Sequence, residues 1–353
     1  MKSNLLGLFA DEIVKELGTY GFEKYRGQQI AKWMYQQGVS DFNVMTNIPN
    51  AKREILIDNF EISRPTITAH QESADKKTSK YLLTFKDGAA VETVLMKQHY
   101  GNSVCVSTQV GCAMGCKFCA STLQGVTRNL TAGEIFSQVL HCNNQLMVEQ
   151  STVNTIVIMG SGEPLANYDN VLRFIRLCHE SYSLNMSYRN ITLSTAGIVP
   201  GIKRLAEEGI PINLAISLHA PTTEIRSSIM PINNQYDMLS VINAADHYAE
   251  KTGRRVTYEY TLIENINDND EHASALAKLL KGRLASVNLI PVNPVPERGL
   301  LRPKKHRVVQ FLQSLQAHHI NATVRKEMGA DIQAACGQLR KKVLEQEESA
   351  CIK

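Results

Sequence analysis

Three cysteines stand close together in the segment Cys112-Ala113-Met114-Gly115-Cys116-Lys117-Phe118-Cys119, separated by three residues and then by two. Thiolates on one short loop can bind three irons of a cubane iron–sulfur cluster, and such clusters usually take four cysteine ligands. Three ligands leave the fourth iron open to another molecule, as a catalytic metal site keeps a vacant position. The spacing therefore predicts a [4Fe-4S] cluster held by Cys112, Cys116 and Cys119.

A zinc site is the alternative for these three cysteines, with a fourth ligand such as His141 or Cys142. Zinc sites favour pairs of cysteines or histidines at short spacing, and no second pair is present. Four of the eight cysteines fall between Cys105 and Cys119. Such clustering in a long chain indicates metal or redox chemistry more than a disulfide framework. A zinc-containing RNA-binding protein without catalysis remains the alternative class.

Polar residues also follow several predicted strands. In Met159-Gly160-Ser161-Gly162-Glu163-Pro164-Leu165, the glycines allow close approach of a ligand, and Glu163 could accept hydrogen bonds from an ammonium group. An ordinary strand-to-helix loop is the alternative. Later strand ends carry Ser194, Ser217, Leu218, His219 and Asn293. Short polar side chains there could bind hydroxyl and carboxylate groups, while Ser194 could instead cap a helix and His219 could be a core histidine.

From about residue 103, short apolar runs alternate with helix-length segments. This alternation predicts the elements that position these groups. The expected strands are 104–106, 155–159, 191–194, 213–218, 256–261, 287–291 and 321–324. The expected helices between them are 131–148, 169–180, 200–208, 237–251, 271–281 and 304–317. This alternation implies an α/β fold with parallel strands covered by helices. About six units favour a partial, open (β/α)6 barrel, in which reactive groups gather at the carboxyl ends of the strands.

The first part of the chain has a different pattern. Residues 8–60 resemble short helices with one apolar face, and two β-prone runs at 81–85 and 91–95 flank Asp87-Gly88, which is a hairpin signal. We therefore expect a small accessory domain over 1–98, the barrel over 99–342 and a flexible tail over 343–353. Since no apolar run is long enough for a signal peptide or a membrane span, we expect a cytoplasmic protein without membrane contact.

The charge is unevenly distributed along the chain. Its net value is +4, but from Arg298 onward there are eleven Lys and Arg against five Asp and Glu. A basic C-terminal region fits RNA binding, although a solvated surface explains the charge as well. The basic residues expected to contact RNA are Lys304, Lys305, Arg307, Arg340 and Lys341.

The Cys-x3-Cys-x2-Cys motif of residues 112–119, in an α/β chain, resembles the signature of the radical S-adenosylmethionine (SAM) superfamily. The resemblance implies that the open iron binds the amino and carboxylate groups of S-adenosyl-L-methionine. One electron then cleaves the sulfonium to a 5′-deoxyadenosyl radical. It also implies a cofactor-binding role for Gly162, Glu163, Ser194, Ser217, Leu218, His219 and Asn293.

A second resemblance narrows the family. The segment Asp331-Ile332-Gln333-Ala334-Ala335-Cys336-Gly337-Gln338-Leu339 closely resembles the RlmN/Cfr family of RNA methyltransferases, and the similarity extends over about 90–342. It implies that Cys336 carries a methyl group, that Cys105 is the resolving thiol and that Glu92 is the proton acceptor. From the residues alone, Cys336 could be a buried inert thiol, Cys105 a packed small side chain and Glu92 an exposed strand residue.

The resemblance also implies a substrate and a mechanism. Polar methyl transfer needs a nucleophile, and adenine C2 is an electron-poor carbon without a usable lone pair. The implied route uses two S-adenosyl-L-methionine molecules per turnover: one methylates Cys336, and the other yields the radical that activates this methyl group for addition to C2. A disulfide between Cys105 and Cys336 forms when the product leaves.

The implied substrates are an adenosine at the peptidyl-transferase centre of 23S rRNA and adenosine in tRNA anticodon loops. The segments Cys119–Leu130 and Glu163–Asn170 resemble the C2 enzymes, with Cfr-like C8 methylation as the alternative. A glycyl-radical activase would need the cluster but neither Cys105 nor Cys336. We further expect an electron donor such as flavodoxin or ferredoxin, and a monomer.

Overall fold

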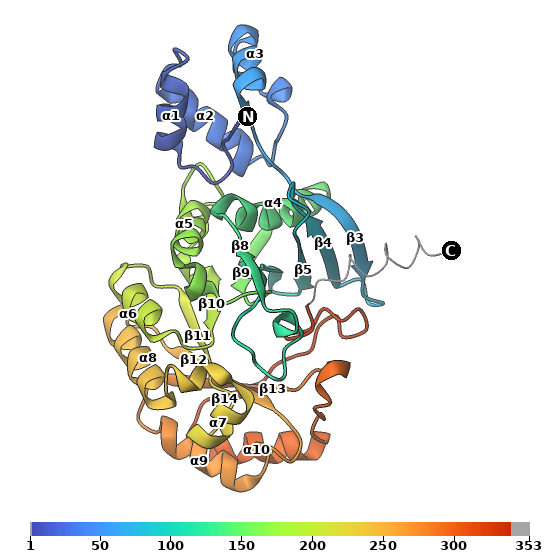
Figure 1. Cartoon of the computed structure of the whole chain (residues 1–353), viewed down its shortest axis with the longest axis vertical. Helices are drawn as coiled ribbons and strands as arrows, with labels where there is room; N and C mark the ends of the chain where they lie inside the picture. The colour runs from blue at the N-terminus through green and yellow to red at the C-terminus, as the bar shows by residue number, and fades with distance from the viewer. Residues whose placement is uncertain (1, 340–353) are drawn as a thin grey trace.

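The computed structural model describes residues 2–339 (Figure 1). Arg340, Lys341 and the tail predicted over 343–353 lie outside the described residues. A large sheet organises the molecule. Its strands are β3 (Thr66–Glu72), β4 (Thr78–Thr84), β5 (Ala90–Gln98), β6 (Gly101–Cys105), β9 (Val153–Ile158), β10 (Ile191–Thr195), β11 (Asn213–Ser217), β12 (Val256–Leu262), β13 (Ala285–Pro291) and β14 (Ala322–Val324). Within the described residues the sheet has ten strands, in the order β14-β13-β12-β11-β10-β9-β6-β5-β4-β3.

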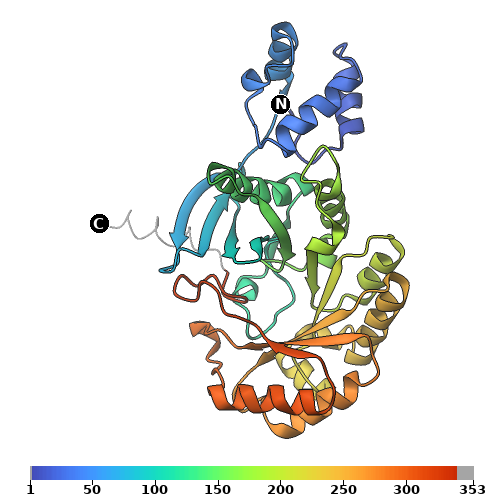
Figure 2. The same ribbon diagram turned by 180° about the vertical axis from the view of Figure 1, so that it is seen from behind.

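The strands from β6 to β14 form the parallel half of this sheet. Helices connect them: α4 (Ala132–Val148), α5 (Tyr168–His179), α6 (Val199–Glu207), α8 (Met238–Thr252), α9 (Asp270–Leu280) and α10 (Lys305–Ala317), with the short α7 (Thr223–Ile229) before α8. Figure 2 shows these helices around the outside of the curved strands. The predicted partial barrel is confirmed, and each predicted strand and helix is present with its ends displaced by a few residues. No helix in this part of the chain is both long and apolar enough to cross a membrane.

The ends of the covering helices follow from the local sequence. Helix α4 begins with a capping box, in which the Thr131 hydroxyl accepts from the backbone of Glu134 and the Glu134 carboxylate accepts from the backbone of Thr131. Helix α8 begins at the capping side chain of Asp237 and ends at Gly253, which adopts the left-handed conformation. Inward-facing apolar residues of these helices and of the strands form one continuous core.

Residues 3–61 form a helical head at one end of the molecule (Figure 1). It contains α1 (Ala10–Gly18), α2 (Tyr25–Tyr35) and α3 (Asn50–Asn59), and the parallel pair β1 (Ser3–Asn4) and β2 (Phe60–Glu61) closes it. Tyr35 connects this head to the barrel. Its hydroxyl accepts from Gly7 N and donates to Leu8 O, both at 2.8 Å, while its ring packs edge-on against Phe136 of α4 at 4.9 Å.

The hairpin predicted around Asp87-Gly88 is present as β4 and β5. It is part of the large sheet, because β5 pairs antiparallel with β6 and places Val94 opposite Cys105. The domain boundary predicted near residue 98 therefore falls between two paired strands. Two further features were not predicted: the exposed edge strand β3, and a small antiparallel ribbon of β7 (Gln109–Gly111) and β8 (Val126–Asn129).

Candidate active site

A cavity opens at the carboxyl ends of the parallel strands and contains about 860 Å³ of empty space, part of it continuous with solvent. The predicted site residues in its walls are Cys112, Cys116, Cys119, Gly162, Glu163, Ser194, Ser217, His219, Asn293 and Cys336. We call this space the cofactor cavity. Its size is that of a small-molecule site. Three predicted site residues do not line it: Leu218, Cys105 and Glu92.

The cysteine loop, residues 112–119, forms one wall of the cofactor cavity. Cys112 and Cys116 are buried and Cys119 is half-buried. The turn is closed by a hydrogen bond from Cys119 N to Cys116 O at 3.2 Å, and Cys112 N donates to Gly125 O at 3.0 Å. Burial raises the pKa of the Cys112 thiol to about 12 and also raises the pKa of Cys116 and Cys119. Binding of iron by these groups as thiolates would therefore release protons.

The donor set fits a cluster better than a single ion. A tetrahedral zinc with bonds of 2.3 Å needs sulfur ligands roughly 4 Å apart. Among residues 2–339, no three His, Cys, Asp or Glu side chains are arranged to hold one metal ion. The suggested fourth zinc ligands also lie elsewhere: His141 packs its ring against Tyr81 at 4.5 Å, and Cys142 is fully buried in the core. Three thiols in one cavity wall, opposite polar strand ends, suit a cluster with one iron open to a cofactor.

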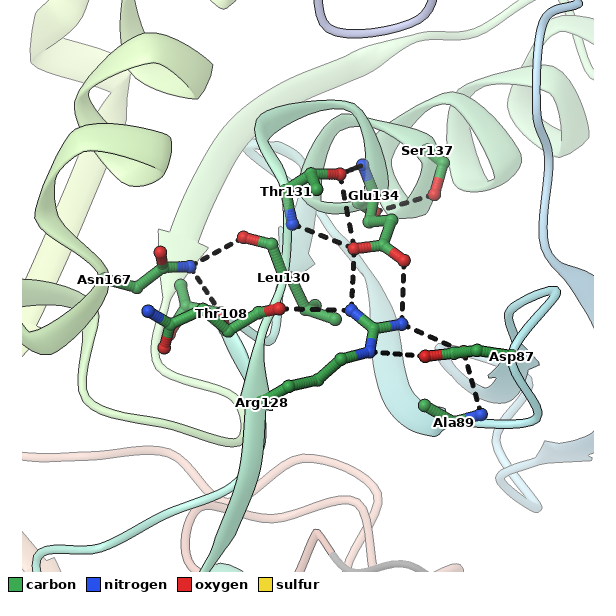
Figure 3. A network of polar contacts seen from close by, with 10 residues as sticks. Asp87, Ala89, Thr108, Arg128, Leu130, Thr131, Glu134, Ser137 and Asn167 are labelled. Carbon is green, nitrogen blue, oxygen red and sulfur yellow. Dashed lines mark hydrogen bonds and ion pairs between the residues drawn. The ribbon is translucent and has the colours of Figure 1, made fainter. Parts of the chain in front are cut away.

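The cysteine loop extends from the β7–β8 ribbon, and Arg128 of this ribbon clamps its base. Figure 3 shows the Arg128 guanidinium between Asp87 and Glu134. Arg128 lies on β8, and its guanidinium donates to the Asp87 carboxylate at 2.6 and 3.0 Å and to the Glu134 carboxylate at 2.9 and 2.8 Å. It thereby joins the ribbon to the β4–β5 turn and to the start of α4. On the other side of the ribbon, Asn167 donates to two backbone carbonyls at 2.9 and 2.7 Å. The loop is thus fixed at its base.

The glycine loop, residues 160–163, approaches the cavity from β9. Gly162 has a φ of +106°, and a Cβ atom there would lie 2.7 Å from the backbone nitrogen of Gln109. Only glycine fits this conformation and this contact. The Glu163 carboxylate accepts from the Thr195 hydroxyl at 2.7 Å and from two backbone N–H groups at 3.0 and 2.7 Å. An ammonium group at this carboxylate would therefore share it with three protein donors.

His219 is a buried, neutral histidine in the cavity wall. Burial lowers its pKa to about 3, and the positive charge of Arg226 acts in the same direction. Its Nδ1 accepts from Thr261 N at 2.9 Å, which assigns the proton to Nε2. Leu218 points into the core instead, while its backbone nitrogen donates to Glu259 O at 3.1 Å. Any contact of Leu218 with a ligand in the cavity would thus involve its backbone.

Two charged residues in the cavity wall were missed from the sequence. Glu259 accepts from the Ser194 hydroxyl at 2.7 Å and pairs with Arg325 at 3.0 Å. The Arg325 guanidinium also contacts the Met159 sulfur at 3.2 Å. The negative charges of an ionised Cys336 sulfur and of the Glu259 carboxylate raise the pKa of Arg325 despite its burial. A signal for Glu259 was available, because a carboxylate between two tyrosines in an apolar strand needs a buried partner.

A second cavity with about 640 Å³ of empty space adjoins the first, and we call it the thiol chamber. Cys105 and Cys336 both line it, and Cys336 also lines the cofactor cavity. Cys336 is therefore part of the boundary between the two spaces. Asn293 holds the Cys336 segment by donating from its side chain to Cys336 O at 2.9 Å. Burial raises the pKa of Cys105 to about 12.

Glu92 lies in a third cavity, with Ser121 and Leu339. Its carboxylate is 6% exposed and pairs with the Lys80 ammonium at 3.2 Å, so Glu92 is a buried residue of β5. Leu339 lines both this cavity and the thiol chamber, so the two spaces share a wall residue.

The basic residues predicted to contact RNA differ in their surroundings. Lys304 and Lys305 are exposed at the start of α10. Arg307 is half-buried, donates to Asp268 O at 2.8 Å and pairs with Asp270 at 3.4 Å. Its guanidinium therefore already has protein partners.

Comparison with known proteins places this arrangement in a family. Residues 106–277 match the model of the radical SAM superfamily, and residues 3–62 match that of the ribosomal RNA large subunit methyltransferase N-terminal domain. Proteins named "probable dual-specificity RNA methyltransferase RlmN" match at 51% identity in Symbiobacterium thermophilum and 50% in Desulforamulus reducens. The alignments cover 95% and 97% of this chain, and 91% and 97% of the relatives.

The chain belongs to the RlmN family of radical SAM RNA methyltransferases. A solved structure agrees: the radical SAM methyltransferase from Sphaerobacter thermophilus is 44% identical and superposes with a TM-score of 0.93 over 96% of this chain and 99% of that one. Membership of the superfamily implies a [4Fe-4S] cluster and S-adenosyl-L-methionine as cofactors, and membership of the RlmN family implies RNA as the substrate class.

Proposed function

We propose that this protein methylates the C2 carbon of adenosine in 23S rRNA, at the peptidyl-transferase centre, and in tRNA anticodon loops. The observation that carries the proposal is the position of Cys336, in the boundary between the cofactor cavity and the thiol chamber. A sulfur in this position can receive a group from one space and pass it on in the other. Cys105 in the chamber supplies the second thiol that such a transfer requires.

The residues of the cofactor cavity suit the two cofactors of the superfamily. Cys112, Cys116 and Cys119 would hold the cluster, with Gly162, Glu163, Ser194, Ser217, Leu218, His219 and Asn293 around S-adenosyl-L-methionine. When bound, these groups supply an electrophilic methyl group and, after reduction by one electron, a 5′-deoxyadenosyl radical. Because Cys336 lines the same cavity, one binding site can serve both uses, at a cost of two cofactor molecules per turnover.

The chain's own residues then act in sequence. Cys336 Sγ gives up its proton and takes a methyl group, which later loses a hydrogen atom so that its carbon can add to adenine C2. One electron must then pass from the adduct to an oxidant, such as the oxidised cluster that Cys112, Cys116 and Cys119 would hold, and Glu92 accepts the C2 proton. Cys105 Sγ gives up its proton and attacks Cys336 Sγ, and the bond between Cys336 Sγ and the methylene breaks. The methylene takes the electron pair and a proton to become the product methyl group, and a disulfide remains.

Anaerobic incubation with reductant, RNA and methyl-deuterated cofactor tests this function. We expect mass spectrometry of digested nucleosides to find a deuterium-labelled methyl group attached to C2 of adenosine in both RNA classes. Label on C8 would establish the Cfr-like alternative instead. Label on neither, with 5′-deoxyadenosine still formed, would favour a radical enzyme with another substrate, such as a glycyl-radical activase, which has no use for the paired thiols.

The remaining partners are proposed from the same chemistry. An electron donor such as flavodoxin or ferredoxin would reduce the cluster. The helical head and the exposed Lys304 and Lys305 would contact RNA through its phosphates. A base inside folded RNA must leave its stack before it can enter the site. We propose that the protein acts as a monomer in the cytoplasm, where these RNA substrates occur.

A further inference from the structure

Three fully buried polar residues meet beside the end of β6: Thr93, Ser107 and Gln138. Gln138 comes from α4, and its Oε1 accepts from Ser107 N at 2.8 Å and from the Thr93 hydroxyl at 2.6 Å. Its Nε2 donates to Ser107 O at 2.8 Å. We call this group the Gln138 hub.

The hub supplies hydrogen-bond partners to the backbone at the point where the central strand β6 ends. Strand β6 stops at Cys105, and the next residue still donates from Val106 N to Val157 O at 3.0 Å. One residue later, the N–H and C=O of Ser107 are bound by the Gln138 amide. A glutamine offers a donor and an acceptor together, whereas an apolar side chain would leave both buried groups unpaired, at about 1–3 kcal/mol each. Gln138 therefore fixes the path of the chain just beyond Cys105.

The Ser107 side chain extends the hub to two other parts of the site. Its hydroxyl donates to Glu92 O at 2.8 Å and accepts from Ser161 N, in the glycine loop, at 2.9 Å. The fit is close, since a Cβ atom on Gly160 would lie 2.6 Å from the Ser107 hydroxyl. The ends of β5 and β6 and the glycine loop thus meet at one serine.

Strand geometry explains why a group behind the sheet can orient residues in front of it. Successive side chains of a strand point to opposite faces. Thr93 points to Gln138, so its neighbours Glu92 and Val94 point to the other face, where Val94 packs with Cys105. Val94 and Cys105 are also directly paired across β5 and β6. Holding Thr93 and Ser107 therefore fixes Glu92 and Cys105 relative to each other.

We propose that the Gln138 hub is a positioning device for the last steps of the reaction: it keeps the Glu92 carboxylate and the Cys105 thiol in register, so that both reach the same RNA adduct. This inference rests on the proposed roles of these two residues. Thr93 and Gln138 contact neither substrate nor cofactor and are positioning residues. Early steps on Cys336 do not depend on this register, whereas release of the product does.

The test compares Gln138→Met and Thr93→Val with a matched control, Ser137→Ala. Ser137 is a neighbouring buried residue of α4 whose hydroxyl donates only within its own helix, to Glu134 O at 2.7 Å (Figure 3). Anaerobic single-turnover reactions with rRNA are quenched over time. Three products are followed: methylated Cys336, 5′-deoxyadenosine and the covalent protein–RNA adduct.

We expect both hub variants to lengthen the lifetime of the adduct by roughly tenfold or more, because a displacement of about 1 Å can slow a reaction a hundredfold. In Thr93→Val, which leaves the Gln138 bonds to Ser107 and the bond from Ser161 N to the Ser107 hydroxyl in place, methylation of Cys336 and formation of 5′-deoxyadenosine should stay within about twofold of the wild-type rates. In Gln138→Met, which removes the partner of the Ser107 backbone, these two rates should fall less than the rate of adduct release. An equal fall in all three rates, an unchanged adduct lifetime, or the same effect in Ser137→Ala would overturn the inference. Should Gln138→Met fail to fold, Thr93→Val loses only one hydroxyl and decides the question.

Cys105→Ala in the same experiment separates the inference from the function on which it rests. If this variant accumulates a covalent adduct and the hub variants do not, the hub inference is wrong and the proposed function stands. If no adduct accumulates even in Cys105→Ala, the proposed function itself fails.

Discussion

The two groups of sulfur atoms in this site are held in different ways. The cysteine loop is local in sequence, and its base is clamped by Arg128 through ion pairs in which the Asp87 side chain is half exposed. Cys105 and Cys336 come from distant segments, and the strand end beyond Cys105 is held by buried, neutral hydrogen bonds to Gln138. The loop needs only a stable base, since a bound cluster would itself fix three thiols. The thiol pair has no such ligand and depends on the fold.

The largest contrast is expected from removing one sulfur of each group. Cys116→Ala should lose cluster iron and, with it, all formation of 5′-deoxyadenosine, because the cluster then lacks one of its ligands. Cys105→Ala should keep both and lose only the release of methylated RNA. Iron and sulfide analysis with chromatography of the nucleoside product measures the difference. Equal loss of 5′-deoxyadenosine in the two variants would show that the cysteine loop and the thiol pair do not have the separate roles described here.

A smaller effect is expected from the buried ion pair beside the thiol chamber. Lys80→Met removes the Lys80 ammonium, which lies 3.2 Å from the buried Glu92 carboxylate, and we expect a loss of about 3–5 kcal/mol in the free energy of unfolding because a buried ion pair is broken. Lys86→Met is the control, because the Lys86 side chain is 65% exposed and its pair with Glu61 should contribute less than about 1 kcal/mol. Chemical denaturation measures both values. Similar losses in the two variants would show that burial does not strengthen the Lys80 pair.

The smallest effect is expected at the clamp of the cysteine loop. Arg128→Met should lower the free energy of unfolding by about 1 kcal/mol, because its ion pairs are reached by solvent. Since salt screens exposed charges, the difference from wild type should shrink at about 1 M salt. Denaturation curves at low and high salt measure this. A loss that is large and independent of salt would show that the clamp behaves like the buried hub.

The cysteine loop and the barrel could be predicted because their signals are local: cysteine spacing, and alternation of apolar runs with helical segments. The pairing of Cys105 with Cys336 could not be worked out this way, since 231 positions of chain separate them, and only family resemblance indicated it. Gln138 gave no signal, because a glutamine in a helix is ordinarily exposed. Arg325 was missed for a related reason: it follows β14 while its partner Glu259 lies on β12, and sequence spacing does not show such contacts.

A pulse–chase experiment tests the central claim, that Cys336 carries the methyl group from the cofactor cavity to RNA. The enzyme is first incubated with methyl-labelled cofactor without RNA, then transferred anaerobically to RNA, reductant and unlabelled cofactor for one turnover. We predict that the label is found first on the peptide containing Cys336 and then, in the same amount, on adenosine. RNA that receives its methyl group from the unlabelled cofactor, while the label stays on the peptide, would contradict the account.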